Sequence, residues 1–200
     1  MALVFVLAAV PAGHAATLEI AVRDANGIPV EDAVAWAIPK AGPAPARKRD
    51  AAIAQRDKTF VPLVSVVQTG TPVQFPNQDP IRHHVYSFSP AKVFELKLYA
   101  GTPAAPVVFD KPGEVVLGCN IHDHMIAYVY VVDTPWFAKT AKDGQAKIDG
   151  LGAGEYDLHV LHYGQAAPRE PSAVRLRADE TLAVAASLVL KPPVPRIPAK

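Results

Sequence analysis

The sequence predicts an all-β protein, and three observations support that prediction. The 200 residues include 20 prolines and 12 glycines but only 8% aromatic residues, a composition that favours short strands joined by many turns. Alternating apolar and polar residues recur along the chain, as expected for strands with one buried face. No stretch has the pattern of a helix of normal length. A length of 200 residues allows one large or two small domains, and half of the residues are hydrophobic, which is enough for a core. The formal net charge of +1 gives no indication of nucleic-acid binding.

Residues 1–16 have the pattern of an export signal. An apolar run from Leu3 to Val10 is followed by small residues, which suit cleavage near Ala15 or Ala16. The run is too short to span a bilayer as a helix. We therefore expect a periplasmic protein that has no membrane span once the signal is removed.

Residues 17–40 predict two strands with a turn between them. Thr17–Asp24 alternates apolar and polar residues, 24–27 indicates a turn, and 30–39 predicts the second strand. Residues 41–57 break this pattern with prolines and a run of three basic residues. Short charge runs are usually solvated, so we predict a linker here. A docking patch for an acidic partner is the alternative.

Residues 58–133 predict a second series of strands. Two of them are expected within Phe60–Phe75. Another begins at His83, and its alternation places His83 and His84 on opposite faces, so only one of them can face a common site. The remaining strands of this series are expected at 93–99, 107–109, 115–117 and 126–132.

After Asp133 the pattern predicts a hairpin around Asp143-Gly144 and two last strands at 174–176 and 182–190. Residues 191–200 hold four prolines and predict an extended tail. Neither 17–40 nor 134–190 has enough strands to close a core alone. We therefore expect these two segments to form one split domain, with 58–133 inserted between them. Two domains in tandem are the alternative.

Cys119, His122 and Met125 lie in one short loop between two predicted strands. Cys119 is the only cysteine, so within the chain it is either a free thiol or a metal ligand. A thiolate, an imidazole and a thioether spaced Cys-x2-His-x2-Met are ligand types that suit a copper electron-transfer site, which needs one more imidazole. Either His83 or His84 supplies it from the strand upstream.

Two other kinds of site fit these residues less well. A structural zinc site normally uses four Cys or His ligands and has no use for Met. A nucleophilic Cys119 would need a His held in place by a third group, and no Asn or Asp is placed for that task. The sequence therefore predicts copper.

The loop resembles the ligand loop of the cupredoxins, most closely that of the amicyanin and plastocyanin branch. Amicyanin has the same Cys-x2-His-x2-Met spacing. The resemblance covers about residues 51–133 and implies a Greek-key β-sandwich with one type 1 (blue) copper. The other segments that carry it are 59–62, 70–77, 83–85 and 109–113.

The resemblance also implies a role for each ligand. His83, Cys119 and His122 would be the strong ligands and Met125 the weak axial one. In the family the ligand His is followed by Asn and Val, so His83 takes the ligand position and His84 replaces the Asn that ties the two ligand segments together. His122 would be the electron exit toward periplasmic redox proteins, such as a dehydrogenase or a c-type cytochrome. With the coordination sphere filled, no substrate position remains, so we do not expect an enzyme.

The flanking segments 17–40 and 134–190 resemble the opening and closing parts of a small transthyretin-like β-sandwich of the carboxypeptidase-regulatory or CnaB type. The chain as a whole resembles bacterial exported proteins labelled methylamine utilization protein. Three functions follow from these resemblances. The first is an electron carrier. The second is a copper-holding or copper-delivering protein in which His84 and His124 serve as entry ligands. The third is an accessory, adhesion-like protein with an empty cupredoxin site.

Overall fold

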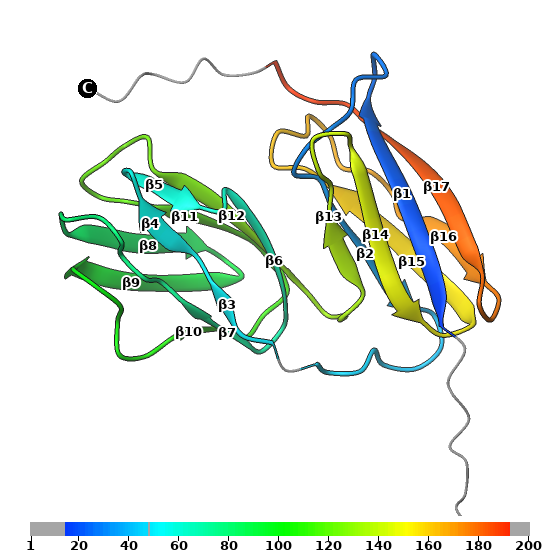
Figure 1. The fold of residues 1–200 in the computed structure, drawn as a ribbon, viewed down its shortest axis with the longest axis horizontal. Helices are drawn as coiled ribbons and strands as arrows, with labels where there is room; N and C mark the ends of the chain where they lie inside the picture. Colours follow the sequence, from blue (N-terminus) through cyan, green and yellow to red (C-terminus); the bar gives the residue numbers. More distant parts are fainter. Residues whose placement is uncertain (1–14, 48, 193–200) are drawn as a thin grey trace, which may run out of the picture.

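The computed structural model describes residues 15–47 and 49–192, in which every regular element is a β-strand (Figure 1). The predicted all-β fold is therefore confirmed. The predicted export signal lies almost wholly outside these residues, as does most of the predicted tail. Within the described ranges there is no helix long and apolar enough to cross a membrane.

The strands fall into two groups that lie side by side in Figure 1. The flanking group takes its strands from both ends of the described chain: β1 (Ala16–Asp24), β2 (Val34–Pro39), β13 (Phe137–Lys139), β14 (Gln145–Leu151), β15 (Gly154–Leu161), β16 (Ser172–Leu176) and β17 (Thr181–Leu188). The central group holds the others: β3 (Ala51–Ala52), β4 (Ala54–Arg56), β5 (Thr59–Val61), β6 (Val64–Gln68), β7 (Thr71–Gln74), β8 (His83–Ser89), β9 (Lys92–Tyr99), β10 (Val107–Phe109), β11 (Gly113–Gly118) and β12 (Ile126–Val132).

The flanking group consists of two sheets, with strand orders β14-β1-β17 and β13-β2-β15-β16. β1 runs antiparallel to β14 and parallel to β17, while β2 runs antiparallel to both β13 and β15. Alternate residues of β1, Leu18, Ile20 and Val22, are fully buried and pack against Leu158 and Leu188 in one apolar cluster. The two N-terminal strands thus pair with strands that follow residue 133.

The central group contains a five-stranded sheet of order β6-β12-β11-β8-β9, a three-stranded sheet of order β10-β7-β3 and the β4–β5 hairpin. One apolar cluster joins the two larger sheets. It includes Val73 from the smaller sheet and Val85, Leu117 and Val129 from the larger one, all fully buried. In the larger sheet β11 is antiparallel to both β12 and β8, which places the start of β8 near the end of β11.

The predicted linker at 41–57 is a linker only in its first part. Ala51 and Ala52 of β3 pair in parallel with β7, and the strand β4 forms a hairpin with β5. Ile53 and Gln55 are buried against the central group, with relative exposures of 1% and 0%. Ile53 and Gln55 therefore face the core, while Arg56 is exposed. The basic run just before this segment obscures the alternation in the sequence.

The segment around Gly144 forms a turn but not the predicted hairpin. β13 pairs with β2 and β14 pairs with β1, so the two strands belong to different sheets. The buried Thr140 marks the crossing, where its hydroxyl donates to the carbonyl of Val30 (2.7 Å) and accepts from the amide of Ala33 (2.9 Å). These bonds hold the chain beside β2, and it then leaves for the other sheet.

A small apolar cluster joins the two groups. Val64 and Tyr130 of the central group are buried with Val34 of β2. Tyr128 of β12 stacks on Tyr163, which follows β15, with ring centroids 4.6 Å apart. The strand β12 therefore contacts the flanking group and also begins where the loop that carries Cys119, His122 and Met125 ends.

Candidate metal centre

The loop between β11 and β12 is held closed by the strands at its two ends. Gly118, the last residue of β11, pairs with Ile126, the first residue of β12. Inside the loop the amide of Met125 donates a hydrogen bond to the carbonyl of His122 (3.0 Å). Cys119 and Met125 are buried, with relative exposures of 4% and 2%. The loop therefore starts and ends in the core and carries His122 between these two points.

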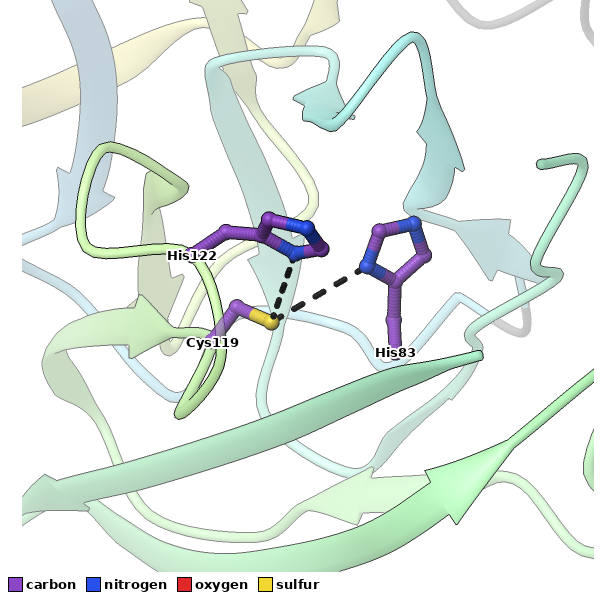
Figure 2. A group of neighbouring side chains, drawn as sticks. All are labelled: His83, Cys119 and His122. Atoms are coloured by element: carbon purple, nitrogen blue, oxygen red, sulfur yellow. Dashed lines mark hydrogen bonds between the residues drawn. The ribbon is translucent and has the colours of Figure 1, made fainter. Parts of the chain in front are cut away.

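His83 reaches the same place from the neighbouring strand. It is the first residue of β8, and the pairing of Tyr86 with Gly118 puts the start of that strand beside the ligand loop. Its side chain is completely buried. The Nδ1 atom of His83 lies 3.9 Å from Sγ of Cys119, and the Nδ1 atom of His122 lies 3.7 Å from the same sulfur (Figure 2).

These three donor atoms form a group that suits one metal ion. They all lie within 4.8 Å of one another. Bonds of about 2.3 Å to sulfur and about 2.0 Å to nitrogen, placed about 120° apart, put the two ligand atoms about 3.7 Å from each other. The observed separations of 3.9 and 3.7 Å match this arrangement. The residues present therefore fit a metal bound by one thiolate and two imidazoles.

Met125 shares the surroundings of Cys119. Both residues belong to the apolar cluster of the central group. Both also line a surface hollow of about 420 Å³, together with Tyr86 and Phe88. The buried Met125 therefore offers a thioether, a weak and soft ligand type, in the same cluster as Cys119.

His84 lies on the other side of its strand. The pairing of β8 with β9 shifts register between His83 and Val85, which marks an irregularity at His84. The Nε2 atom of His84 lies 3.0 Å from the carboxylate of Glu95, and its ring meets Tyr86 edge to face. The structure therefore brings His83, and not His84, beside Cys119.

His124 also lies outside the donor group. Its side chain is exposed, its ring centroid lies 6.0 Å from that of His122, and its Nε2 atom lies 3.1 Å from the backbone carbonyl of Lys58. His122 itself is partly buried. Burial is the main cause that lowers the pKa of His122, and electrostatic interactions with His83, Lys58 and His124 lower it further. The lowered pKa favours the neutral imidazole, the form that binds metals.

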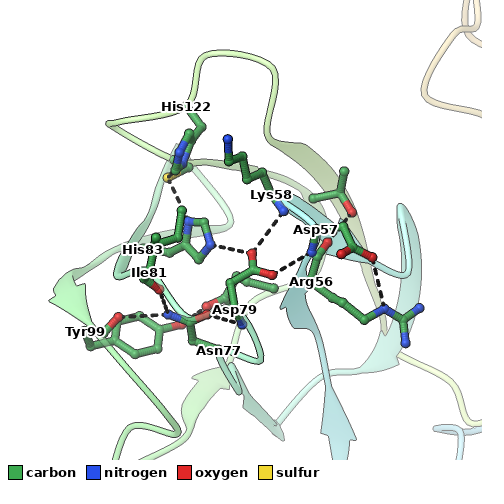
Figure 3. A network of polar contacts seen from close by, with 12 residues as sticks. Arg56, Asp57, Lys58, Asn77, Asp79, Ile81, His83, Tyr99 and His122 are labelled. Carbon is green, nitrogen blue, oxygen red and sulfur yellow. Dashed lines mark hydrogen bonds and ion pairs between the residues drawn. The ribbon is translucent and has the colours of Figure 1, made fainter. Parts of the chain in front are cut away.

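Asp79 is a site residue that the sequence did not indicate. Its Oδ2 atom lies 2.7 Å from Nε2 of His83, on the side of the ring away from Cys119 (Figure 3). Burial alone would raise the pKa of Asp79, but hydrogen bonds from the amide of Lys58, the ring of His83 and the amide of Asp57 hold that pKa below its usual value. In the sequence Asp79 belongs only to a polar turn. It lies four residues before His83, and this spacing predicts a contact in a helix but not in a loop that leads into a strand.

Comparisons with known proteins gave likenesses of fold only. No protein-family model matches the chain, and a search of curated proteins gave no match. Among solved structures, a copper-containing nitrite reductase (NirK) from Thermus scotoductus is 26% identical over 46% of this chain and 25% of its own, with a TM-score of 0.39. The chain thus spans about a quarter of the length of that protein.

Two smaller proteins are matched over nearly their whole length. A purple cupredoxin from Nitrosopumilus maritimus is 23% identical over 41% of this chain and 99% of its own, with a TM-score of 0.37. Amicyanin from Paracoccus versutus is 12% identical over 48% of this chain and 97% of its own, with a TM-score of 0.35. At these low TM-scores the likenesses are partial.

Proposed function

We propose that this chain is an exported type 1 copper protein that carries single electrons between periplasmic redox proteins. The observation that carries the proposal is the group of His83, Cys119 and His122, whose three donor atoms lie within 4.8 Å of one another. One thiolate and two imidazoles with a thioether nearby are the ligand types of blue-copper electron-transfer sites. Copper bound there supplies a one-electron couple.

The surroundings of the site support a carrier rather than an enzyme. Cys119 and Met125 are buried in an apolar cluster, and strands fix both ends of their loop. Rigid, apolar surroundings favour one arrangement of the ligands in both oxidation states. If Met125 completes the set, no position is left for a substrate, whereas catalytic metal sites keep one open.

His122 is the proposed exit for the electron. It is the most exposed member of the donor group, and its neighbour Ile121 is 48% exposed. A partner that docks here, such as a periplasmic dehydrogenase or a c-type cytochrome, would approach the imidazole past Ile121 and past the exposed, polar Asp123 and His124. We further propose that the central group is a cupredoxin-like domain inserted into a split, transthyretin-like one, in an exported protein of the methylamine utilization type.

The absorption spectrum of the copper-loaded protein tests the proposal. We expect an intense visible band from charge transfer between the thiolate and Cu(II), which Cys119→Ser abolishes because the band requires the copper–sulfur bond. Glu95 belongs to β9 and contacts His84, which is not in the donor group. Glu95→Gln therefore serves as a control and should keep the band. A colourless Cu(II) protein, or an equal band in Cys119→Ser, would contradict the proposal.

A further inference from the structure

The carboxylate of Asp79 is held against His83 by three separate hydrogen bonds. Its Oδ2 atom lies 2.7 Å from Nε2 of His83 and accepts a bond from the amide of Lys58 (3.0 Å), while Oδ1 accepts one from the amide of Asp57 (2.7 Å). The side chains of both His83 and Asp79 are nearly or fully buried, at 0% and 8% exposure. Figure 3 shows this network beside the donor group.

We propose that Asp79 is a positioning residue, which keeps the ring proton of His83 on Nε2, leaves Nδ1 free for the metal, and adds a negative charge that favours Cu(II) over Cu(I). This inference rests on the proposed function. A carboxylate accepts hydrogen bonds but does not donate them, so His83 must donate from Nε2 across the 2.7 Å separation. In the neutral ring Nδ1 then carries no proton, and Nδ1 is the nitrogen that faces Cys119. Carboxylates that accept from metal-binding imidazoles fix the tautomer and make the ligand more basic.

The turn that holds Asp79 has an uncommon backbone. Asp57 and Lys58, between β4 and β5, have φ angles of 53° and 54°. This left-handed region is uncommon for residues other than glycine, but the favoured two-residue hairpin turn requires it at both central positions. Both amides of the turn donate to the same carboxylate. The tight β4–β5 hairpin thus presents both amides of its turn to Asp79.

A second set of bonds fixes the segment from Asn77 to His83. The Oδ1 atom of Asn77 accepts from the amide of Asp79 (3.0 Å). Its Nδ2 atom donates to the carbonyls of Ile81 (2.8 Å) and Tyr99 (3.0 Å). The buried Asn77 therefore holds the loop that carries Asp79 against β9, and the carboxylate cannot easily turn away from His83.

The neighbouring pair of His84 and Glu95 provides a matched control. It has the same chemistry, with Nε2 of His84 3.0 Å from Oε1 of Glu95, and it lies next to His83 in the sequence. The Glu95 side chain is 51% exposed, and His84 is not in the donor group. Asp79→Asn and Glu95→Gln each remove one charge near the site, but only the first removes a buried one that touches a ligand.

The first measurement needs no variant and no metal. Ring nitrogen shifts of ¹⁵N-labelled histidines in the metal-free protein report which nitrogen of His83 carries the proton. We expect the proton on Nε2. A proton on Nδ1 of His83 would overturn the inference, whether or not any variant folds. Because this test uses the protein without metal, its result is independent of the proposed function.

The second measurement compares reduction potentials of the copper-loaded proteins. We expect Asp79→Asn to lower the ratio of Cu(II) to Cu(I) affinity at least tenfold, which raises the potential by about 59 mV or more for one electron. Glu95→Gln should change this ratio less than twofold because its charge is exposed. Equal effects in the two variants, with the visible band retained, would overturn the role of Asp79. If the unaltered protein forms no coloured site at all, it is the proposed function that fails, and the nitrogen shifts still decide the tautomer.

Discussion

The ring of Tyr86 lies directly against the backbone of Gly118, one residue before Cys119. A Cβ atom at position 118 would sit 2.7 Å from Cζ of that ring and 2.8 Å from its hydroxyl oxygen. Real Cβ atoms do not come this close to other heavy atoms, so any side chain at position 118 requires the Tyr86 ring to move. The pairing of Tyr86 with Gly118 also sets how β8 lies beside the ligand loop.

Gly118→Ala should therefore disturb the site as well as the stability. The added methyl group must push away Tyr86 or the backbone before Cys119, and overpacking of this kind costs about 1–3 kcal/mol of the free energy of unfolding. We expect a lower urea midpoint and a shifted or weaker visible band. Gly152→Ala is the control, because the nearest atom to its Cβ is the Tyr156 hydroxyl at 3.8 Å. Equal behaviour of the two variants would contradict this reading of the contact.

His83→Ala and His84→Ala should have opposite effects on colour. Only the Nδ1 atom of His83 faces Cys119, while His84 faces Glu95 on the other side of the strand. We expect the first variant to lose the visible band and the second to keep it at similar intensity. The measurement is the spectrum of each protein after loading with Cu(II). Loss of the band in His84→Ala alone would show that the other histidine is the ligand.

The stability of the flanking group should fall when the medium becomes mildly acidic. Burial lowers the pKa of His162, against the opposing effect of Asp32, and Nδ1 of His162 accepts a hydrogen bond from the amide of Gly164 (3.0 Å). The unfolded chain takes up this proton near pH 6.5, whereas the folded chain resists it until a lower pH. The unfolded state therefore binds more protons in that window, and the free energy of unfolding decreases as pH falls through it, then levels off.

His162→Asn tests this dependence, because an amide oxygen can replace Nδ1 as an acceptor but does not titrate in this range. Urea unfolding of the metal-free proteins at pH 7.5 and pH 5.5 gives the comparison. The loss of stability between the two pH values should be smaller in the variant. An unchanged loss would mean that other groups titrate there, among them His159, whose pKa burial also lowers.

Repeated reduction beside a moderate Cu(I) chelator separates a carrier from a copper-delivery protein. The buried Cys119 and Met125 and the closed loop favour retention of copper in both states. We expect the visible band to return in full after each cycle. Loss of copper in the first few reductions would favour delivery, with the exposed His124 near His122 as a transfer ligand.

A chain that ends at Asp133 should separate the two proposed domains. It would lack β13 to β17, which supply the described strand partners of β1 and β2. We expect residues 51–133 to keep a folded, coloured site and residues 16–39 to become sensitive to protease. Protection of the N-terminal strands in the shortened chain would contradict a split domain and favour two domains in tandem.

The sequence predicted much of the fold and part of the site because those features depend on local patterns. The alternation of Thr17–Asp24 matches β1, and the spacing of Cys119, His122 and Met125 corresponds to one loop between two strands. Both features need only the chain near them. The position of His83 beside Cys119 was predicted from the family resemblance, and in the structure Nδ1 of His83 lies 3.9 Å from Sγ of Cys119.

The features that the sequence did not predict depend on partners far along the chain. Ala51 and Ala52 form a strand because β7 lies next to them, not because of their own residue types. The segment around Gly144 forms a tight turn, yet the strands before and after it join different sheets. Asp79 meets His83 because the β4–β5 turn, more than twenty positions earlier, donates two amides to its carboxylate.

The parallel pairing of β1 with β17 has a consequence for the order in which the newly made chain folds. Thr17 pairs with Thr181, and the register continues to Asp24 and Leu188. When the chain emerges from the ribosome or an export channel, β1 appears first and then waits for nearly all of the remaining residues before this partner arrives. The central strands have their partners closer in sequence and can assemble during that interval. The region of Cys119 can therefore fold before the sheet that contains β1 is complete.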